Sequence, residues 1–292
     1  VLSRSFLRLA TTNRGSAKTV YKARGQKTRT LEGALLQKEF RRYLGSSIYM
    51  LNCSLGVLLM PIAAVMLIYN AGSMQTMLAV PMLRQILPLL SVGAVCMILS
   101  MNDLTAPSVS LEGKNLWIVQ VFPVPARKVL EAKLKLHLLL TVIPAIPLVA
   151  AVEWVTKPDP LNGVLMPVAI LLFIVLMAEL GLCVNLKMPN LNWTSETVPV
   201  KQSMSVTVAL FGGWVIVMAF AGLYVLLNSI LSPGAYLALV CGLLLVFSGI
   251  FLMLGKRISA AIPLPVSAAV SLYQTASYLI SIADNEKNFG IV

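Results

Sequence analysis

Few side chains in this sequence have the types and spacing that chemistry requires. The four cysteines lie far apart within apolar runs: Cys53, Cys96, Cys183 and Cys241. A zinc site or a redox pair needs closely spaced ligands or thiols, so we interpret the cysteines as small packing residues and expect no metal centre. His137 is the only histidine and follows Lys133 and Lys135 at the start of an apolar run. This setting favours a position at the edge of that run rather than a metal ligand.

Acidic side chains are equally scarce inside the apolar runs. Glu153 and Glu179 fall in neighbouring runs near opposite ends, so they are not expected to form a pair for acid–base catalysis. Glu179 is a candidate for lining a polar path; the alternative is a carboxylate near a membrane interface, close to Asn185 and Lys187. The sequence has no Gly-x-Ser-x-Gly elbow and no Gly-x-x-x-x-Gly-Lys-Ser/Thr phosphate loop. We therefore expect no catalytic, metal-binding or cofactor-binding residues, and no ATP hydrolysis by this chain itself.

The composition explains this scarcity. Of 292 residues, 58% are hydrophobic and only 12% are charged, which lies outside the range of soluble globular chains. A helix needs about 20 apolar residues to cross a bilayer, and several runs reach that length. The predicted fold class is all-α, a polytopic membrane protein.

Six membrane spans are predicted, with basic residues alternating between their connections. The spans are Ile48–Tyr69, Ile86–Met101, Leu136–Val155, Leu161–Leu186, Val206–Leu227 and Ala235–Leu254. Lysines and arginines gather at 114–135, at 187–201 and at 256–257, whereas the opposite connections hold few charges. By the positive-inside rule the basic connections and both chain ends are cytosolic, in the inner (plasma) membrane.

The ends of the chain differ from this six-span region at 34–257. Residues 1–33 are predicted to be a basic cytosolic linker or tail, since residues 1–42 contain eleven Lys or Arg and only two acids. Attraction to anionic lipid explains this charge better than nucleic-acid binding, and an organellar transit peptide is a further alternative. Residues 34–46 form an amphipathic pattern expected of an interfacial elbow helix, with a cytosolic helix on a partner as the alternative. Residues 258–292 are predicted to be an interfacial or cytosolic segment, with a helix near 267–282.

Two loops on the basic side contain turn-forming and aromatic residues that a simple connection does not need. The first reads SLEGKNLW from Ser110 to Trp117 and leads through a Pro-x-Pro break into a basic helix. The second, Lys187 to Gln202, combines turn-forming residues with Trp193, Thr194 and Glu196. Loops of this kind are typical of docking elements.

These loop strings, the amphipathic helix and the six spans together carry a family resemblance. Over about residues 34–257 the sequence resembles the permease subunits of the type-2 ATP-binding-cassette exporter superfamily, with Leu111 standing where a more polar residue is expected. Members often hold two six-span halves, so the resemblance implies the C-terminal half of a larger bacterial permease. It also implies that the chain forms the substrate pathway and couples to a separate cytosolic ATPase, which holds ATP and magnesium. The other expected partners are membrane lipid and either a second six-span half or a second copy of the chain. Nucleic acid is not an expected partner.

The coupling role is assigned to particular side chains. The expected ATPase-coupling loop contains Ser110, Glu112, Gly113, Lys114, Trp117 and Arg127, and the second cytosolic loop contributes Asn192, Trp193 and Glu196. Glu112 and Lys114 either pair with charges on the partner or solvate an exposed turn. Trp117 is either an interface anchor or a membrane-interface tryptophan. A non-catalytic membrane scaffold or assembly subunit would share the hairpins and the basic ends, and is the alternative function.

Overall fold

The described part of the protein is helical throughout. The computed structural model describes residues 30–116 and 124–261, and no strand occurs among them. The chain divides into two units, residues 1–31 and 32–292, and every described residue except Thr30 and Leu31 lies in the second. The predicted linker up to residue 29, Trp117 and the predicted helix at 267–282 lie outside the described residues.

The elements follow one another with short connections. In chain order they are α2 (Leu31–Gly45), α3 (Ser47–Cys53), α4 (Leu55–Tyr69), α5 (Ala71–Leu78), α6 (Pro81–Leu99), the 3₁₀ helix η1 (Ser110–Asn115), α8 (Ala126–Thr156), α9 (Pro160–Lys187), α10 (Thr197–Lys201), α11 (Met204–Leu227) and α12 (Pro233–Ala261). The predicted helical stretch at 34–46 thus coincides with α2. Its place at a membrane surface stays a prediction.

Four stretches are long and apolar enough to cross a membrane, as expected of a membrane protein. They are α8, α9, the stretch Thr197–Leu227 that includes α10 and α11, and most of α12, Pro233–Ile258. They correspond to the last four of the six predicted spans, although α8 begins ten residues before the expected Leu136. The basic segment that precedes the apolar run is therefore part of the same continuous helix.

The first two predicted spans are not confirmed. The segment expected to be one helix breaks near Ser54, and α3 and α4 meet at a bend of 50°, so they count as one span only if taken together. The second has only the shorter apolar stretch Leu83–Leu99. At 1.5 Å per residue that stretch is about 25 Å long, below the roughly 30 Å of a hydrocarbon core.

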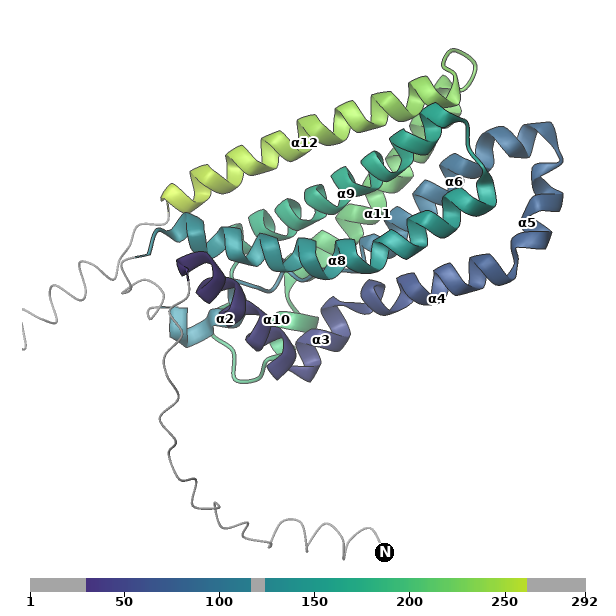
Figure 1. Ribbon diagram of the computed structural model, residues 1–292. Coiled ribbons are helices and arrows are strands. Elements are labelled where there is room, and N and C mark those ends of the chain that lie inside the picture. Colours follow the sequence, from purple (N-terminus) through teal and green to yellow (C-terminus); the bar gives the residue numbers. More distant parts are fainter. Residues whose placement is uncertain (1–29, 117–123, 262–292) are drawn as a thin grey trace, which may run out of the picture. The chain divides into compact units, whose positions relative to one another are not determined.

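Helix α9 is the centre of the helix packing. It contacts α6, α8, α11 and α12, which run alongside it (Figure 1). Its side chains Phe173, Ile174 and Met177 are almost completely buried in the main apolar core. By contrast, large apolar side chains on α4, α11 and α12 are exposed, including Val65, Val215 and Met253. Apolar residues on outward faces are what lipid contact requires.

The basic residues collect at one end of the helices. α8 begins there, whereas α9 and α12 end there, next to α2, α3 and α10 (Figure 1). This end, called here the polar end, holds Lys128, Lys187, Lys256 and Arg257. At the opposite end lie the α8–α9 and α11–α12 turns.

Two predictions about single residues have different outcomes. All four cysteines are buried and free, as expected of packing residues. His137 is only 1% exposed, and its predicted place at the edge of the apolar run stays a prediction. It lies one helical turn past Lys133 on the face of α8 that packs inward, and neither ring nitrogen has a hydrogen-bond partner.

Candidate functional site

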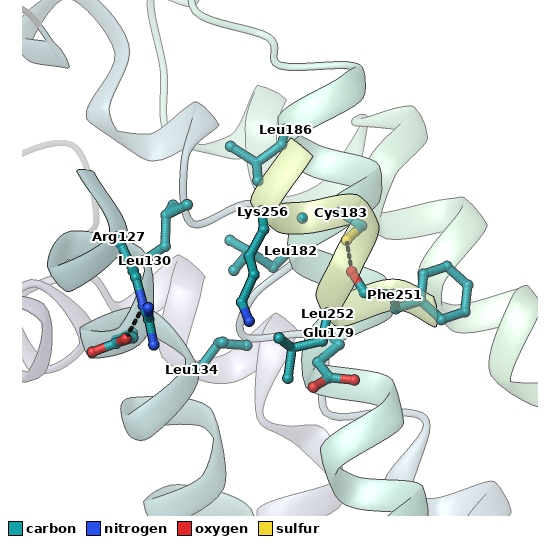
Figure 2. Close-up of a pocket in the computed structure, with 12 residues that line it drawn as sticks. Arg127, Leu130, Leu134, Glu179, Leu182, Cys183, Leu186, Phe251, Leu252 and Lys256 are labelled. Carbon is teal, nitrogen blue, oxygen red and sulfur yellow. Dashed lines mark hydrogen bonds and ion pairs between the residues drawn. The ribbon is translucent and has the colours of Figure 1, made fainter. Parts of the chain in front are cut away.

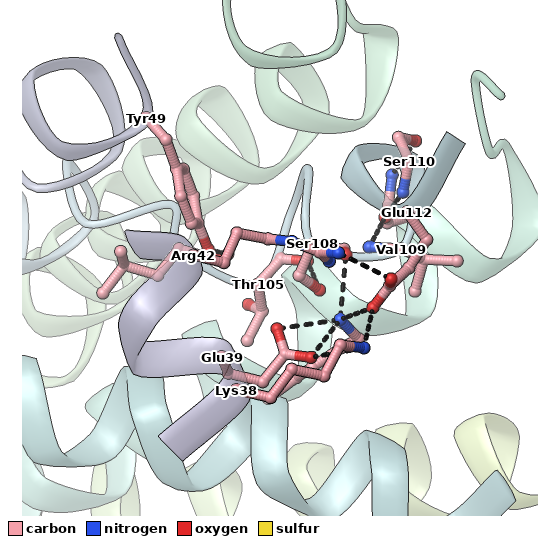
Figure 3. Close-up of polar contacts among 12 residues, drawn as sticks. Lys38, Glu39, Arg42, Tyr49, Thr105, Ser108, Val109, Ser110 and Glu112 are labelled. Atoms are coloured by element: carbon pink, nitrogen blue, oxygen red, sulfur yellow. Dashed lines mark hydrogen bonds and ion pairs between the residues drawn. The ribbon is translucent and has the colours of Figure 1, made fainter. Parts of the chain in front are cut away.

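The polar end is organised around one buried lysine. The Lys133 ammonium lies 3.0 Å from both carboxylate oxygens of Glu39 on α2 and 2.9 Å from Oε1 of Glu112 on η1. Figure 3 shows these two carboxylates facing each other across the cluster. It also donates to the carbonyl oxygen of Ser108. The side chains of Lys133, Glu39 and Glu112 are at most 5% exposed. Buried charges of this kind persist only when they are paired and hydrogen-bonded, so these contacts hold three separate elements together.

Two further cations from α2 complete the pairing of Glu112. Lys38 approaches Oε1 at 2.9 Å and the Arg42 guanidinium approaches Oε2 at 2.7 Å. Burial by itself raises the pKa of Glu112, but Lys133, Arg42 and Lys38 outweigh burial and hold that pKa well below its usual range. Glu112 is therefore a carboxylate at neutral pH. Lys38, Glu39, Arg42, Glu112 and Lys133 form what we call the ion-pair cluster.

A second set of contacts surrounds Asn185 near the end of α9. Its side-chain oxygen accepts from the backbone N–H groups of Val109 and Ser110, at 2.8 and 3.0 Å. Its amide nitrogen donates to the hydroxyls of Ser110 and Ser205, at 2.8 and 3.0 Å. Asn185 is completely buried and uses both ends of its amide, so it fixes the 102–115 loop against α9 and α11.

Gly113 and Trp193 join the two basic-side loops. The indole N–H of Trp193 donates to the Ser110 carbonyl at 2.7 Å. Gly113 has a φ of 51°, and a Cβ there would lie 3.0 Å from the Trp193 ring. Only glycine meets both conditions without strain. Gly113 therefore allows the first loop to approach the second loop of the same chain closely.

The residues predicted for the first loop occupy different environments. Ser110 and Glu112 are buried among contacts within the chain. Arg127 is largely exposed and pairs with Glu131 on α8. Trp117 and the side chain of Lys114 lie outside the described residues. The coupling role of this loop stays a prediction, whereas the possibility that Glu112 merely solvates an exposed turn is wrong.

The second-loop residues and Glu179 also differ. Asn192 is exposed and Trp193 is half-buried. Glu196 accepts a hydrogen bond from the Ser46 hydroxyl at the start of α3. Glu179 accepts from Ser248 of α12 at 2.6 Å, and lies away from the ion-pair cluster beside a pocket. Its predicted role in a polar path stays a prediction.

Sequence reasoning missed Lys133 and Asn185, the residues with the most buried contacts. Lys133 was interpreted as one of several basic residues flanking a span. A signal was present, because Val129, Ala132, Leu136 and His137 share the helical face on which Lys133 lies. A lysine within such an apolar stripe is costly to bury alone and therefore indicates a carboxylate partner. We use the name polar junction for the ion-pair cluster together with Ser110, Asn185 and Trp193.

Comparison with known protein families shows the family of the chain. A family profile described as "Putative ATP-binding cassette" matches residues 29–273, well over half of the chain. The chain belongs to this family. No curated protein and no solved structure matches the chain.

This membership corrects the sequence-based interpretation. The matching family is described as an ATP-binding cassette, not as a permease, so the assignment to exporter permease subunits and the function drawn from it were wrong. That interpretation relied on the order of apolar helices and two loop strings, and a shared architecture does not determine function.

The expectation of a non-hydrolytic chain is overturned by the same match. Members of the ATP-binding cassette class typically hydrolyse ATP. The missing phosphate-loop string had been used to exclude hydrolysis, and it does not decide the matter.

Proposed function

We propose that this protein is a membrane-embedded member of an ATP-binding cassette transport system, in which the use of ATP changes the arrangement of helices at the polar end. The observation that carries the proposal is the extent of the family match. Residues 29–273 include the polar junction as well as all four long apolar helices. The helices and the junction thus belong to one family unit.

The geometry of the polar junction supports this proposal. Hydrogen bonds and ion pairs within it join α2, η1, α8, α9 and the loop after α9. Elements connected by buried polar contacts move together, because separating them exposes unpaired charge. α8 then continues from this junction as a single helix of 31 residues. A shift of the junction therefore changes the tilt of a helix that is long enough to cross the membrane.

The orientation is also part of the proposal. We place the polar end on the cytosolic side of the plasma membrane, because Lys128, Lys187, Lys256 and Arg257 gather there and few charges lie at the other end. α2 then lies at the membrane surface as an elbow. The bent pair α3–α4 and the shorter α6 act as the first two of six spans, the latter by local thinning of the bilayer.

The partners follow from the ATP dependence. The proposed system is completed by nucleotide with magnesium and by a cytosolic ATPase subunit. It also includes surrounding lipid and either a second six-span half or a second copy of this chain. Docking of the ATPase at the 110–127 segment and at Asn192–Glu196 belongs to this proposal.

The test measures a distance between two spin labels at the polar end, in native membranes or in nanodiscs that contain the whole system. Spin labels are placed at Arg41 on α2, one of the elements that the polar junction joins, and at Arg257 on α12, which is not one of them, and both positions are exposed. We expect ATP with magnesium to change the distance distribution between them, and ATP with a magnesium chelator to leave it unchanged. An unchanged distribution with hydrolysable ATP would contradict the proposal.

A matched comparison shows which chain hydrolyses the nucleotide. ATP hydrolysis is measured for the purified protein and for the same protein with its co-purifying subunits. We expect hydrolysis in the complete system. Its absence there, with folded protein, would remove the ATP-dependent role.

A further inference from the structure

A pocket of about 300 Å³ lies between α8, α9 and α12 near the polar end (Figure 2). That volume is at the lower end of the range for small-molecule sites. All twelve lining residues come from these three helices, which are long and apolar enough to cross a membrane. The pocket is separate from the ion-pair cluster, with which it shares no residue.

The lining changes character with depth. Arg127 on α8 and Lys256 on α12 lie at the ends of their helices, where the polar end begins. Further along the helices the walls are mostly leucine, formed by Leu130, Leu134, Leu182 and Leu252, with the Glu179 carboxylate among them. From Arg127 to Leu134 the helix rises about 10 Å. The pocket therefore has a basic mouth and an apolar wall as long as several methylene groups.

Two basic residues bring positive charge to this end of the pocket, and Arg127 has donors left for an anion. Arg127 uses its Nε for Glu131, at 2.7 Å, and a guanidinium has further N–H donors. Its side chain is 71% exposed, so these donors are accessible. Lys256 extends from α12 across the pocket toward the α8 wall (Figure 2). Glu179 lies deeper and is engaged by Ser248.

We propose that this pocket binds one anionic phospholipid, with its phosphate at Arg127 and Lys256 and one acyl chain along the leucine wall. The occupant must be amphiphilic, because the pocket offers positive charge at one end and apolar side chains along its wall. A soluble anion leaves the apolar wall uncovered, and a neutral apolar molecule makes no use of the two cations. A basic pocket between membrane helices at the headgroup level is a recognised setting for anionic lipid.

Gly255 provides a way to block the acyl chain separately from the headgroup. It lines the pocket one residue before Lys256, and a Cβ there would lie 3.3 Å from the Cys183 sulfur. Gly255→Leu places a branched side chain in this narrow space. The basic mouth stays intact in that variant.

The experiment measures lipid binding to the detergent-solubilised full-length protein by native mass spectrometry, without nucleotide. The probes are phosphatidylglycerol, phosphatidylcholine and soluble glycerol 3-phosphate. Each basic residue near a headgroup contributes about 1 kcal/mol, so R127Q/K256Q should bind phosphatidylglycerol about 30-fold more weakly than the parent. Gly255→Leu should also weaken binding. Lys187 and Lys201 are exposed and do not line the pocket, so K187Q/K201Q should bind like the parent.

Several results would overturn this inference. Equal affinity for phosphatidylcholine would remove the role of the two cations, and displacement by glycerol 3-phosphate would indicate a simple anion site. Parent-like binding by R127Q/K256Q, or an equal loss in K187Q/K201Q, would place the lipid elsewhere. Thermal unfolding of each variant shows that it is folded. Because no ATP is present, failure here leaves the proposed ATP-dependent function untouched.

Discussion

A single ammonium group joins α2 to α8 through two carboxylates. Lys133 contacts Glu39 and Glu112, and all three side chains are withdrawn from solvent. Such a cluster gains little stability relative to an apolar core, but losing one member leaves unpaired buried charge. Its importance lies in the geometry that it imposes on the polar junction.

Replacement of Lys133 by alanine should therefore destabilise the protein strongly. Loss of the ammonium leaves Glu39 and Glu112 facing each other without it, at a cost of roughly 3–5 kcal/mol in the free energy of unfolding. The measurement is unfolding by SDS in mixed micelles. Lys135→Ala is the matched control, because Lys135 lies two residues further along α8 and pairs with Glu32 at an exposed site. Equal losses in the two variants would contradict the role assigned to the buried cluster.

Glu112 should also make the protein sensitive to acid. Its pKa in the folded state is depressed, so its contribution to stability is fully present above the ordinary value of 4.5 and is lost as the pH falls below it. We expect the free energy of unfolding to decline below about pH 4.5, and to decline less steeply in Glu112→Gln. The readout is the unfolding midpoint as a function of pH.

Asp103 provides the control for this pH dependence. Burial raises the pKa of Asp103 well above the ordinary 3.8, so its ionisation lowers the stability of the fold as the pH rises. This effect on stability is opposite in sign to that of Glu112. Asp103→Asn should leave the acid decline in place. If Asp103→Asn abolished that decline and Glu112→Gln did not, the assignment of the acid-sensitive group would be wrong.

At the scale of helices, one close contact fixes α11 against its neighbours. A Cβ at Gly213 would lie 2.6 Å from the Cβ of Ser100 and 2.8 Å from the methyl carbon of Met177. Helices approach this closely only where a side chain is missing. Gly213 therefore sets the distance from α11 to the end of α6 and to α9.

Gly213→Val should overpack this contact and destabilise the protein by about 1–3 kcal/mol. A Cβ at Gly222 on the same helix would meet no atom within 4 Å, so Gly222→Val is the matched control and should cost less. Both are compared by SDS-induced unfolding. A larger loss for Gly222→Val would show that helix propensity, not packing, controls the effect.

The helices were easier to predict than their contacts. Long apolar runs predict α9 and α11 to within two residues and the apolar part of α12, Pro233–Ile258, to within four, because burial of the backbone in lipid leaves few alternatives to helix. The break near Ser54 was missed, since it lies within a run that remains apolar on both sides.

The partners of Lys133 lie 94 and 21 residues away in the chain. Hydrophobic periodicity contains no information on such distant pairs, and this is why the candidate loops were found but their buried connections were not.

At the scale of the whole molecule, the distribution of charge determines the proposed orientation. The polar end combines the ion-pair cluster with the basic ends of α8, α9 and α12, and Arg84 and Lys157 are the basic residues among those described toward the opposite end. Moving the polar end across the bilayer would require many charges to leave the cytosol. The positive-inside rule therefore favours one orientation.

Cysteines introduced at exposed positions test that orientation. Ser73, within α5, and Asn228, after α11, lie at the far end, whereas Ser195 lies in the loop at the polar end, and all three are exposed. The four native cysteines are buried and should give little background. In intact cells, an impermeant maleimide should label Ser73→Cys and Asn228→Cys but not Ser195→Cys, which should react only after the membrane is permeabilised. The opposite pattern would reverse the proposed orientation. Labelling of Asn228→Cys but not of Ser73→Cys would show that α3–α4 and α6 do not reach the outer face, because the hairpin that they form would then remain on the cytosolic side.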